Sequence, residues 1–434
     1  ADYGAENVES TFRSCYAGEE EHGSVRLPRS AGGKGRREAD EANKPAEVEA
    51  IEAFLFSQAE FRHNVITHHC EIRWTEEAGF LPLTDRDVNT LWGRMNKTVG
   101  RVYLTDIYNV IHSEFVPLFN PFQSYFDHLP SWDGVSDPIG DLADTVHVKS
   151  DQAEFRDYFR KWFVGILPAL LDDTVVNHEI LVLIGEQGLY KTTWFNFLLP
   201  PELRCYFYTK TNSDRLNKDD LFSLTEFALI CFEELDGMRP AELNQLKAMV
   251  TMPYVNERAA YGRNTERHPH IASFCGTGNN VQFLTDPTGN RRWLPFEVSQ
   301  IRDPHQHAIP YELVYSQAYA LWKSGFCHWF SQEEIRVLNT HNSRFEVPNL
   351  EEDLIRTHFR KPFEGEAGIF VTAADILEQI SSCLRYPLSP NKIGRIMAGL
   401  EFESIRYKGK RGYITVKKTG EDIDRERRSG ALGL

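Results

Sequence analysis

Apolar and polar positions follow different periods along the chain, and these periods predict an α/β protein. Four short runs are almost continuously apolar, as the buried strands of a parallel sheet are: "EILVLIG", "FALICFEE", "IASFCGTGNN" and "RRWLPFEV". Helical spacing separates the runs, and an amphipathic helical stretch at 152–172, expected to break near Pro168, precedes them. Strands that alternate with helices predict a parallel sheet covered on both faces.

The flanking segments predict the domain boundaries. Residues 1–48 are polar and charged, which favours a disordered linker. Residues 49–145 combine helical periods with a strand or hairpin at "FRHNVITHHCEIRW", which indicates an accessory N-terminal domain that is mainly helical. The parallel sheet is expected in 146–340, and an acidic linker in 341–366.

The C-terminal segment differs from the whole chain in charge. Residues 367–420 hold two helical patterns and two alternating strands around a glycine turn, the outline of a winged helix, and 421–434 form a tail. Leu384 to Lys418 contains nine basic and two acidic residues, whereas the chain has a net charge of −15. A DNA-docking winged helix needs such a basic helix and loop, and a protein-binding wing with solvated lysines is the alternative. The candidate DNA contacts in this segment are Lys392, Arg395, Lys408, Lys410 and Arg411.

Composition limits the classes of protein. No apolar run approaches the length of a membrane span, so we expect no membrane partner. The seven cysteines lack paired spacing, which favours reduced thiols and a cytoplasmic location. The negative net charge argues against non-specific coating of nucleic acid by the whole surface, but it leaves room for local basic patches.

The segment "GEQGLYKTTWF", residues 185–195, follows the first apolar run and nearly has the pattern of a phosphate-binding loop. In such a loop, glycines allow a tight turn, and N–H groups at a helix start point at the phosphates. Lys191 is spaced to reach the β- and γ-phosphates and Thr192 to ligate magnesium, which predicts ATP and Mg²⁺. Tyr190 stands where the second glycine normally lies, and a plain strand–turn–helix with an exposed lysine is the alternative. The expected nucleotide contacts are Gly185, Glu186, Gln187, Gly188, Leu189, Tyr190, Lys191, Thr192 and Thr193.

Acidic residues end the second apolar run, about forty residues downstream of the loop. A strand end of this kind brings one carboxylate near the metal and another near the attacking water. We assign Glu233 to magnesium and Glu234 to polarising water, with Asp236 as a reserve. A solvated turn after a core strand is the alternative.

Two more polar segments follow in the order in which one sheet would space them. Asn279 ends the third apolar run and is suited to orient water or contact the γ-phosphate. Arg291 and Arg292 lie in "DPTGNRRW" and are suited to act on the phosphoryl group of a neighbouring subunit. A surface turn whose arginines pair with acids is the alternative. The order of the four segments favours a shared site, because independent accidents rarely line up.

The stretch from Leu181 to Val298 resembles the virulence-associated E (VapE-like) P-loop proteins of bacterial mobile elements, which are related to superfamily 3 helicases. The resemblance rests on "LIGEQGLYKTTWF", "FEELDG", "YGRN" and "FCGTGNNVQFLTDPTGNRRW", and with "NPFQSYFDHLPSWDG" it covers roughly Glu49 to Phe330. It implies an ASCE/AAA+-like ATPase core. By resemblance, Walker A comprises Lys191 and Thr192, Walker B Glu233 and Glu234, sensor 1 Asn279, and the arginine finger Arg291 or Arg292.

The resemblance also suggests where DNA would run. Superfamily 3 motors thread single-stranded DNA past hairpins between the acidic strand and the sensor, and "NERAAYGRNTERHPH" occupies that interval. Arg258, Arg263 and Arg267 are suited to grip phosphates there, and Tyr261 to stack on bases. A charged surface hairpin is the alternative.

The expected function is an ATP-driven DNA helicase or translocase encoded by a prophage or plasmid, acting on single-stranded or forked DNA. An arginine finger requires a neighbour, so we expect a homo-oligomer, most simply a hexamer. The alternative is a nucleotide-controlled DNA-binding switch (an initiator, regulator or phage-defence module) in which Tyr190 cripples hydrolysis. A small-molecule P-loop kinase fits less well, because it has no role for the basic C-terminal segment.

Overall fold

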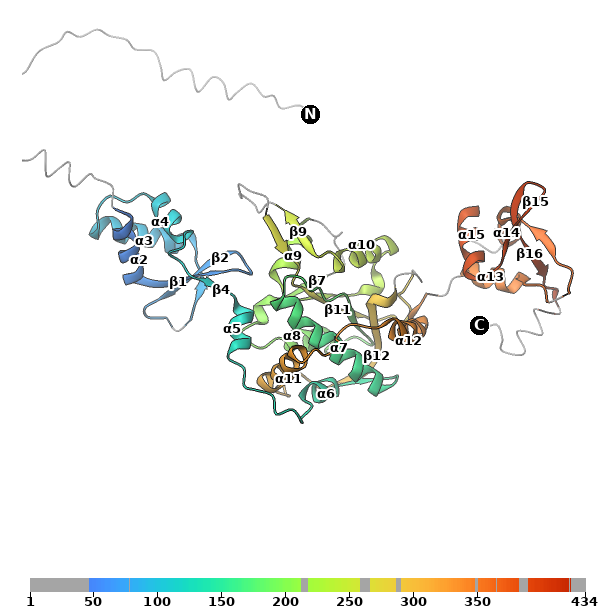
Figure 1. Cartoon of the computed structure of the whole chain (residues 1–434), viewed down its shortest axis with the longest axis horizontal. Coiled ribbons are helices and arrows are strands. Elements are labelled where there is room, and N and C mark those ends of the chain that lie inside the picture. Colours follow the sequence, from blue (N-terminus) through green and yellow to red (C-terminus); the bar gives the residue numbers. More distant parts are fainter. Residues whose placement is uncertain are drawn as a thin grey trace, which may run out of the picture. The chain divides into compact units, whose positions relative to one another are not determined.

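The computed structural model describes residues 47–77, 79–211, 218–257, 266–285, 290–347, 350–363, 365–381, 389–420 and 422. The chain divides after Phe119 into two units, each described here by itself (Figure 1). None of the helices within these described ranges is long and apolar enough to cross a membrane.

The first unit combines helices with a small sheet. Its helices are α2 (Val48–Gln58), α3 (Asp85–Thr98) and α4 (Leu104–Ile111). Its strands, in sheet order, are β3 (Leu81–Pro82), β2 (His69–Trp74), β1 (Ala59–Asn64) and β4 (Leu118–Phe119). Thr84 caps α3 with a reciprocal capping box, and β1 and β2 form the expected hairpin.

The expected boundary at residue 145 is wrong for this unit, which ends at Phe119. Residues 120–145 belong to the second unit because their aromatic side chains pack there. The ring of Phe122 lies 4.9 Å from that of Tyr206, and the ring of Phe126 lies 5.9 Å from that of Tyr315. These contacts involve α5 (Pro121–Asp127), and α6 (Pro138–Ala143) follows it.

A six-stranded sheet organises the second unit. In sheet order its strands are β5 (Val146–Val148), β12 (Trp293–Ile301), β6 (Ile180–Ile184), β11 (Ser273–Gly278), β8 (Leu229–Phe232) and β7 (Phe207–Lys210). All neighbouring strands are parallel except the edge pair of β5 and β12. The four apolar runs are β6, β8, β11 and β12, so the predicted parallel sheet is confirmed.

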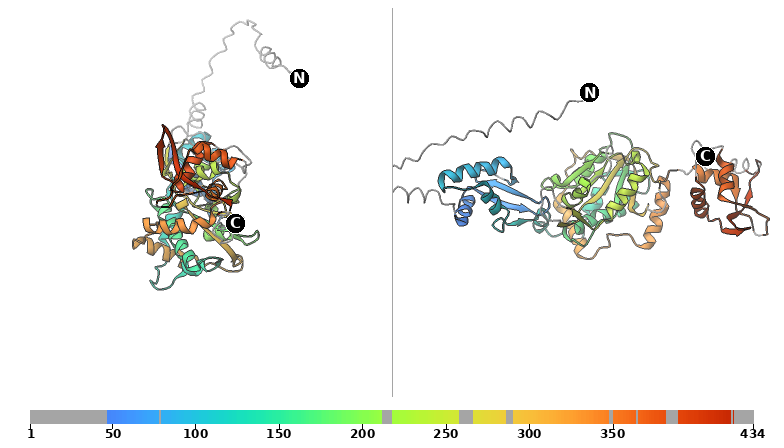
Figure 2. Two further views of the ribbon diagram at one scale, coloured as in Figure 1. Left: turned by 90° about the vertical axis from the view of Figure 1, so that its right-hand side faces the viewer. Right: turned by 90° about the horizontal axis from the view of Figure 1, so that it is seen from above.

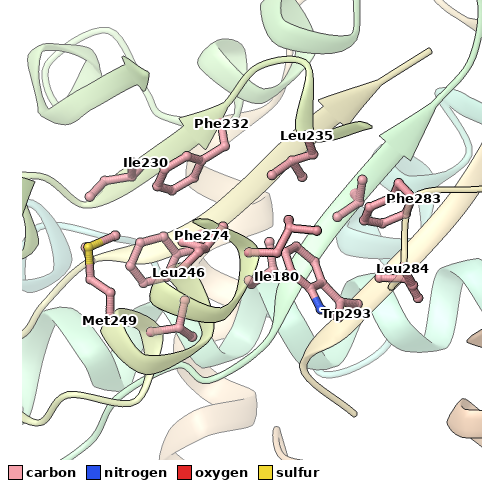
Figure 3. Close-up of a cluster of buried hydrophobic side chains, with 14 of the residues drawn as sticks. Ile180, Ile230, Phe232, Leu235, Leu246, Met249, Phe274, Phe283, Leu284 and Trp293 are labelled. Atoms are coloured by element: carbon pink, nitrogen blue, oxygen red, sulfur yellow. The ribbon is translucent and has the colours of Figure 1, made fainter. Parts of the chain in front are cut away.

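Helices cover both faces of this sheet (Figure 2). They are α7 (Gln152–Leu171), α8 (Lys191–Leu198), α9 (Lys218–Glu226), α10 (Pro240–Val250) and α12 (Gln332–Asn342). Helix α11 (Tyr311–Lys323) packs on α7, where the ring of Tyr315 contacts that of Phe163. On one face, Ile180 of β6 and Phe274 of β11 lie against Leu246 and Met249 of α10 (Figure 3). Burial of such a side chain stabilises the fold by about 2 kcal/mol.

Helix α7 packs on the other face and does not break at Pro168. The helix continues to Leu171, and Pro168 lies in its last turn. A proline removes one main-chain hydrogen bond, but here buried side chains on either side of it hold the helix in place. The indole of Trp162 also donates to the main-chain oxygen of Phe274 at 3.0 Å, which ties α7 to β11.

The last part of the second unit has its own core. Its strands β13 (Phe359–Arg360), β14 (Ile369–Val371) and β15 (Ser404–Tyr407) all pair with β16 (Lys410–Lys417). Its helices are α13 (Leu350–His358), α14 (Ala373–Ser381) and α15 (Pro390–Gly399). The two helices and two strands expected in 367–420 are therefore present.

The expectation that 341–366 is wholly a linker is wrong, because α13 and β13 lie within it. Ile355 and Phe359 are spaced by four residues and are both buried in the C-terminal core. The acidic residues at the start of α13 hid this periodicity, and one of them, Glu351, is itself buried in an ion pair with Lys392.

A short two-stranded hairpin precedes β11. It pairs β9 (Tyr254–Glu257) with β10 (Glu266–Pro269) in antiparallel register. The chain order therefore runs from the acidic end of β8 through α10 and this hairpin to β11.

Candidate functional site

The turn between β6 and α8 depends on two glycines. Gly185 donates its N–H to the Gly278 oxygen at 3.1 Å, and a Cβ at Gly185 would lie 2.8 Å from the Val298 oxygen. Gly188 has a φ of +84°, a conformation that side chains disfavour. The close backbone approach and the left-handed turn explain why glycine stands at these two positions.

Tyr190 adopts the backbone conformation that a glycine would take. Its φ is +59°, in the left-handed region, and it immediately precedes the first residue of α8. Such a conformation costs a non-glycine residue roughly 1–2 kcal/mol. The side chain remains 43% exposed, and the residue lines the pocket described below. The tyrosine therefore preserves the course of the turn at the cost of local strain.

Lys191 is buried and surrounded by oxygen atoms. Its Nζ donates to the main-chain oxygens of Gly185 at 2.5 Å and Glu186 at 2.8 Å, and to Oδ1 of Asn279 at 3.4 Å. Burial lowers the pKa of Lys191, and the nearby charge of Asp236 partly opposes this effect. The contacts hold the ammonium inside the turn, at the carboxyl end of β6.

The ends of β6 and β8 meet through a side-chain hydrogen bond. Thr192 donates from Oγ1 to Oε1 of Glu233 at 2.8 Å. Glu234 has a φ of +54°, so the chain turns sharply after Glu233 instead of continuing as a strand. This turn explains how two adjacent acidic residues, which would point to opposite faces of a strand, line the same pocket.

Asp236 connects the end of β8 to the end of β11. Its carboxylate accepts from the N–H of Asn279 at 3.1 Å, the N–H of Asn280 at 3.1 Å, and the side-chain amide of Asn280 at 2.8 Å. Sequence reasoning held this residue only in reserve. The structure assigns it a positioning role, because it fixes the backbone that carries Asn279.

These groups line one pocket of about 350 Å³ at the carboxyl edge of the sheet. Its lining residues are Gln187, Gly188, Leu189, Tyr190, Lys191, Thr192, Thr193, Glu233, Glu234, Thr277, Gly278 and Asn279. The strand ends thus bring together most of the residues expected around a nucleotide. Gly185 and Glu186 contribute through the main-chain oxygens that Lys191 contacts. Thr277 was not expected; its place just before Gly278 at a strand end was the available signal.

Arg291 and Arg292 lie at the amino ends of the parallel strands, opposite the carboxyl ends that line the pocket. They precede Trp293, which pairs with Ile180 at the start of β6, whereas the pocket begins after Ile184. Five strand residues span about 16 Å, so neither guanidinium is close to the pocket of its own chain. Burial lowers the pKa of Arg292, and the charge of Arg291 lowers it further.

Of the four DNA contacts expected between the acidic strand and β11, the structure describes Arg267. Arg258, Tyr261 and Arg263 lie outside the described residues. Arg267 in β10 stacks its guanidinium on the ring of Tyr254, 3.5 Å from the ring centroid. The two residues join adjacent strands at the base of the hairpin.

The five candidate contacts in the C-terminal part differ in their surroundings. Lys392 is in an ion pair with Glu351, although its side chain remains partly exposed. Arg395 is exposed on α15. Lys408, Lys410 and Arg411 are exposed on the hairpin formed by β15 and β16.

Comparison with known proteins identifies the family. The model of the Virulence-associated protein E-like domain matches residues 127–347, about half of the chain. The chain belongs to this family, as the resemblance in its motifs indicated.

The solved structures that match the chain have little sequence in common with it. The apo structure of the NrS-1 C terminal region (305-718) is 11% identical with a TM-score of 0.45, covering 86% of this chain and 99% of that one. The A form apo structure of the same region is 11% identical with a TM-score of 0.44 and the same coverage. No curated protein sequence matches the chain.

Proposed function

We propose that this protein is a P-loop ATPase that uses ATP and Mg²⁺ and acts as a DNA helicase or translocase of a prophage or plasmid. One observation carries the proposal. A buried lysine, the hydrogen-bonded pair of Thr192 and Glu233, and the exposed Glu234 line one pocket at the carboxyl ends of parallel strands. Parallel α/β sheets bind ligands at this edge.

The chemistry of the pocket fits a nucleotide with its metal. Hydroxyl and carboxylate oxygens, here Thr192 Oγ1 and Glu233 Oε1, are the ligand types that Mg²⁺ prefers. The first N–H groups of α8 have no partner within the helix, and a helix start favours negative charge. Lys191 adds a full positive charge beside them. The bound Mg²⁺ would supply further neutralisation of phosphate charge.

Three residues of the pocket, and Asp236 behind them, then have definite tasks. Lys191 exchanges its carbonyl contacts at Gly185 and Glu186 for phosphate oxygens. Glu234 accepts a hydrogen bond from the attacking water and polarises it. Asn279 orients that water or contacts the γ-phosphate, and Asp236 holds Asn279 in position.

The position of the arginines supports the proposal of a homo-oligomer. Arg291 and Arg292 are remote from the pocket of their own chain, so as arginine fingers they would serve a neighbouring subunit. A closed ring repeats this contact between every pair of neighbours, and we propose a homo-oligomer, most simply a hexamer.

We propose single-stranded or forked DNA as the partner. Arg267 and its stacked Tyr254 lie in the hairpin between the acidic strand and β11. In the C-terminal part the other strands all pair with β16, and this supports our proposal that it is a winged helix. Both regions offer cations to phosphates.

Steady-state ATP hydrolysis by the full chain, with and without single-stranded DNA, tests the proposal. Glu234→Gln should lower kcat by about 100-fold or more and leave ATP affinity unchanged, because the carboxylate acts on water. Glu202→Gln, an exposed acid outside the pocket, is the matched control. Undiminished turnover in Glu234→Gln, or turnover that DNA does not stimulate, would contradict the motor.

The strain at Tyr190 favours a second candidate, a nucleotide-controlled DNA-binding switch acting as an initiator, regulator or phage-defence module. In this alternative the aromatic side chain at the mouth of the pocket slows hydrolysis, and bound nucleotide only sets the assembly state. Tight ATP binding without turnover in the same assay supports the switch.

A further inference from the structure

The hairpin of β15 and β16 concentrates positive charge at its tip. Arg406, Lys408, Lys410 and Arg411 are all exposed, and residues 405–411 include no acidic residue. In Figure 1 this hairpin, drawn in red, rises beyond α14 and α15. Exposed charge alone is ordinary on a protein surface, so its arrangement is what matters.

The two arginines of the tip face each other across the hairpin. Arg406 is the direct partner of Arg411 in the antiparallel register. Like charges in this relation destabilise a sheet. Arg411 donates from Nε to the hydroxyl of Ser404 at 2.8 Å, and within the described part of the chain neither guanidinium forms an ion pair with a carboxylate. The fold therefore tolerates a repulsion here that an external anion would relieve.

The turn presents a further cation and an aromatic ring. Lys408 and Gly409 form the two-residue turn, with φ values of +48° and +80°. Asparagine or glycine is preferred at the first of these positions, so a lysine there is a costly choice for the fold. Tyr407 is 51% exposed, and the ammonium of Lys408 lies 5.3 Å from the centroid of its ring.

Two of the nearby acids are engaged by residues outside the tip. Asp375 accepts from Thr372, and Lys410 is close enough to lower the pKa of Asp375, after the larger effect of Thr372. Glu401 is in an ion pair with Lys361, and Glu403 is exposed just before β15.

Helix α15 offers less free charge than its sequence suggests. The ammonium of Lys392 is bound by the buried carboxylate of Glu351 in α13. This pair joins two helices of the C-terminal core, so moving Lys392 onto DNA would break an ion pair to a buried carboxylate. The other cation of α15, Arg395, is exposed.

We infer that the tip of this hairpin, from Arg406 to Arg411, binds the sugar–phosphate backbone of DNA without reading its sequence, and that α15 is not the principal contact. The inference rests on the proposed function for its choice of partner. Phosphates repeat along a strand at a spacing that lets several cations bind at once. The arginine pair on one face of the hairpin and Lys408 at its turn bind phosphates, whereas Tyr407 lies on the other face, where its ring packs against Phe370.

Fluorescence anisotropy of the full chain tests this, with a labelled thirty-nucleotide single strand and a duplex of the same sequence, over a range of KCl concentrations. Arg406→Ala with Arg411→Ala should weaken binding about tenfold at moderate salt. It should also reduce the salt slope by about 1.4 on single strands, 0.7 for each phosphate that an arginine no longer neutralises. Arg356→Gln with Lys361→Gln removes two ion-paired cations of the same region and should change affinity less than twofold.

Four further readouts separate this role from a structural one and from the proposed ATPase. The thermal midpoint of the double alanine variant should stay level or rise, because a repulsion is removed. Arg406→Lys with Arg411→Lys should recover the salt slope, and scrambling the DNA sequence should leave the affinity unchanged. ATP hydrolysis without DNA should equal that of the wild type, so a failure here is distinguishable from a failure of the proposed ATPase. An unchanged salt slope, a midpoint that falls together with affinity, or a larger loss in Lys392→Gln would overturn the inference.

Discussion

The two edges of the six-stranded sheet carry contrasting chemistry. At the carboxyl edge, Lys191 is enclosed by oxygen atoms, and Glu233 and Asp236 are fixed by hydrogen bonds from neighbouring segments. At the amino edge, Arg291 and Arg292 are adjacent. Burial lowers the pKa of the nearby His178, and the charges of the two arginines lower it further.

The difference shows what each edge can do alone. The carboxyl edge already holds its polar groups in a mutually compatible arrangement, which suits a small charged ligand. The amino edge gathers cations that oppose one another, which suits an anionic surface supplied by another molecule. In the proposed ring these are the two halves of one site, contributed by adjacent subunits.

The largest effect is expected for Lys191→Ala. Loss of the buried cation should weaken ATP binding and reduce hydrolysis by roughly 100-fold or more, since a group of this kind stabilises charge in a site protected from water. Isothermal titration and a phosphate-release assay measure both. Lys149→Ala, which removes a lysine bound to Glu297 beside the same turn, should retain near wild-type values. Equal losses of ATP binding and hydrolysis in the two variants would mean that any positive charge in this region supports them, and not the position of Lys191 in the pocket.

The second-largest loss of ATP hydrolysis is expected when Arg291 and Arg292 are replaced. Arg291→Ala with Arg292→Ala should lower kcat by roughly 100-fold or more while leaving ATP affinity nearly unchanged. If they act between subunits, mixing this variant with Lys191→Ala subunits should restore part of the hydrolysis, because some interfaces then hold one intact pocket and one intact pair. Activity that stays at the level of the separate variants at every mixing ratio would refute action between subunits.

A smaller effect concerns His270, just before β11 at the amino edge. Burial lowers its pKa from 6.5 to about 4, and its Nδ1 lies 2.7 Å from the Met252 oxygen. Between these pH values the unfolded chain binds more protons than the folded one, so stability is lost as the pH falls from 6.5 towards 4. Urea unfolding should show a loss of about 2 kcal/mol between pH 7 and pH 5 from this residue.

The matched variants for this test are His270→Asn and His307→Gln. Asparagine keeps a donor near the position of Nδ1 but does not titrate, so it should flatten the pH dependence. His307 is exposed, and its replacement should not. An identical pH dependence in His270→Asn and the wild type would show that the amino edge does not need a neutral histidine.

The smallest effect is expected for Tyr190→Gly. Glycine removes the left-handed strain of roughly 1–2 kcal/mol but adds freedom to the unfolded chain, so stability should change by less than about 1 kcal/mol. Nucleotide turnover should rise, because the mouth of the pocket opens. Tyr190→Ala opens the mouth but retains the strain and is the control. A turnover that falls in both variants would show that the aromatic ring assists binding.

Much of the carboxyl edge was predictable from sequence because it depends on local patterns. Continuous apolar runs identified β6, β8 and β11, and the order of polar residues after them indicated a shared edge. Glycine spacing identified the turn before Lys191, and the backbone at Tyr190 follows the course that the glycine pattern implies.

Other features depend on contacts that no local pattern records. The turn at Glu234 places two adjacent acids in one pocket, whereas strand periodicity predicts opposite faces. Asp236 acts through the backbone of a strand more than forty residues away. Helix α13 was hidden because its buried acid, Glu351, is compensated by Lys392 of α15, which only the fold brings near.

The most direct measurement is a structure of the full chain with Mg²⁺ and a non-hydrolysable ATP analogue. Triphosphate density should occupy the turn between β6 and α8, with Lys191 Nζ moved from the Gly185 oxygen to a phosphate and the metal against Thr192 and Glu233. Density at any other surface, or a Tyr190 side chain occupying the phosphate position, would contradict the account.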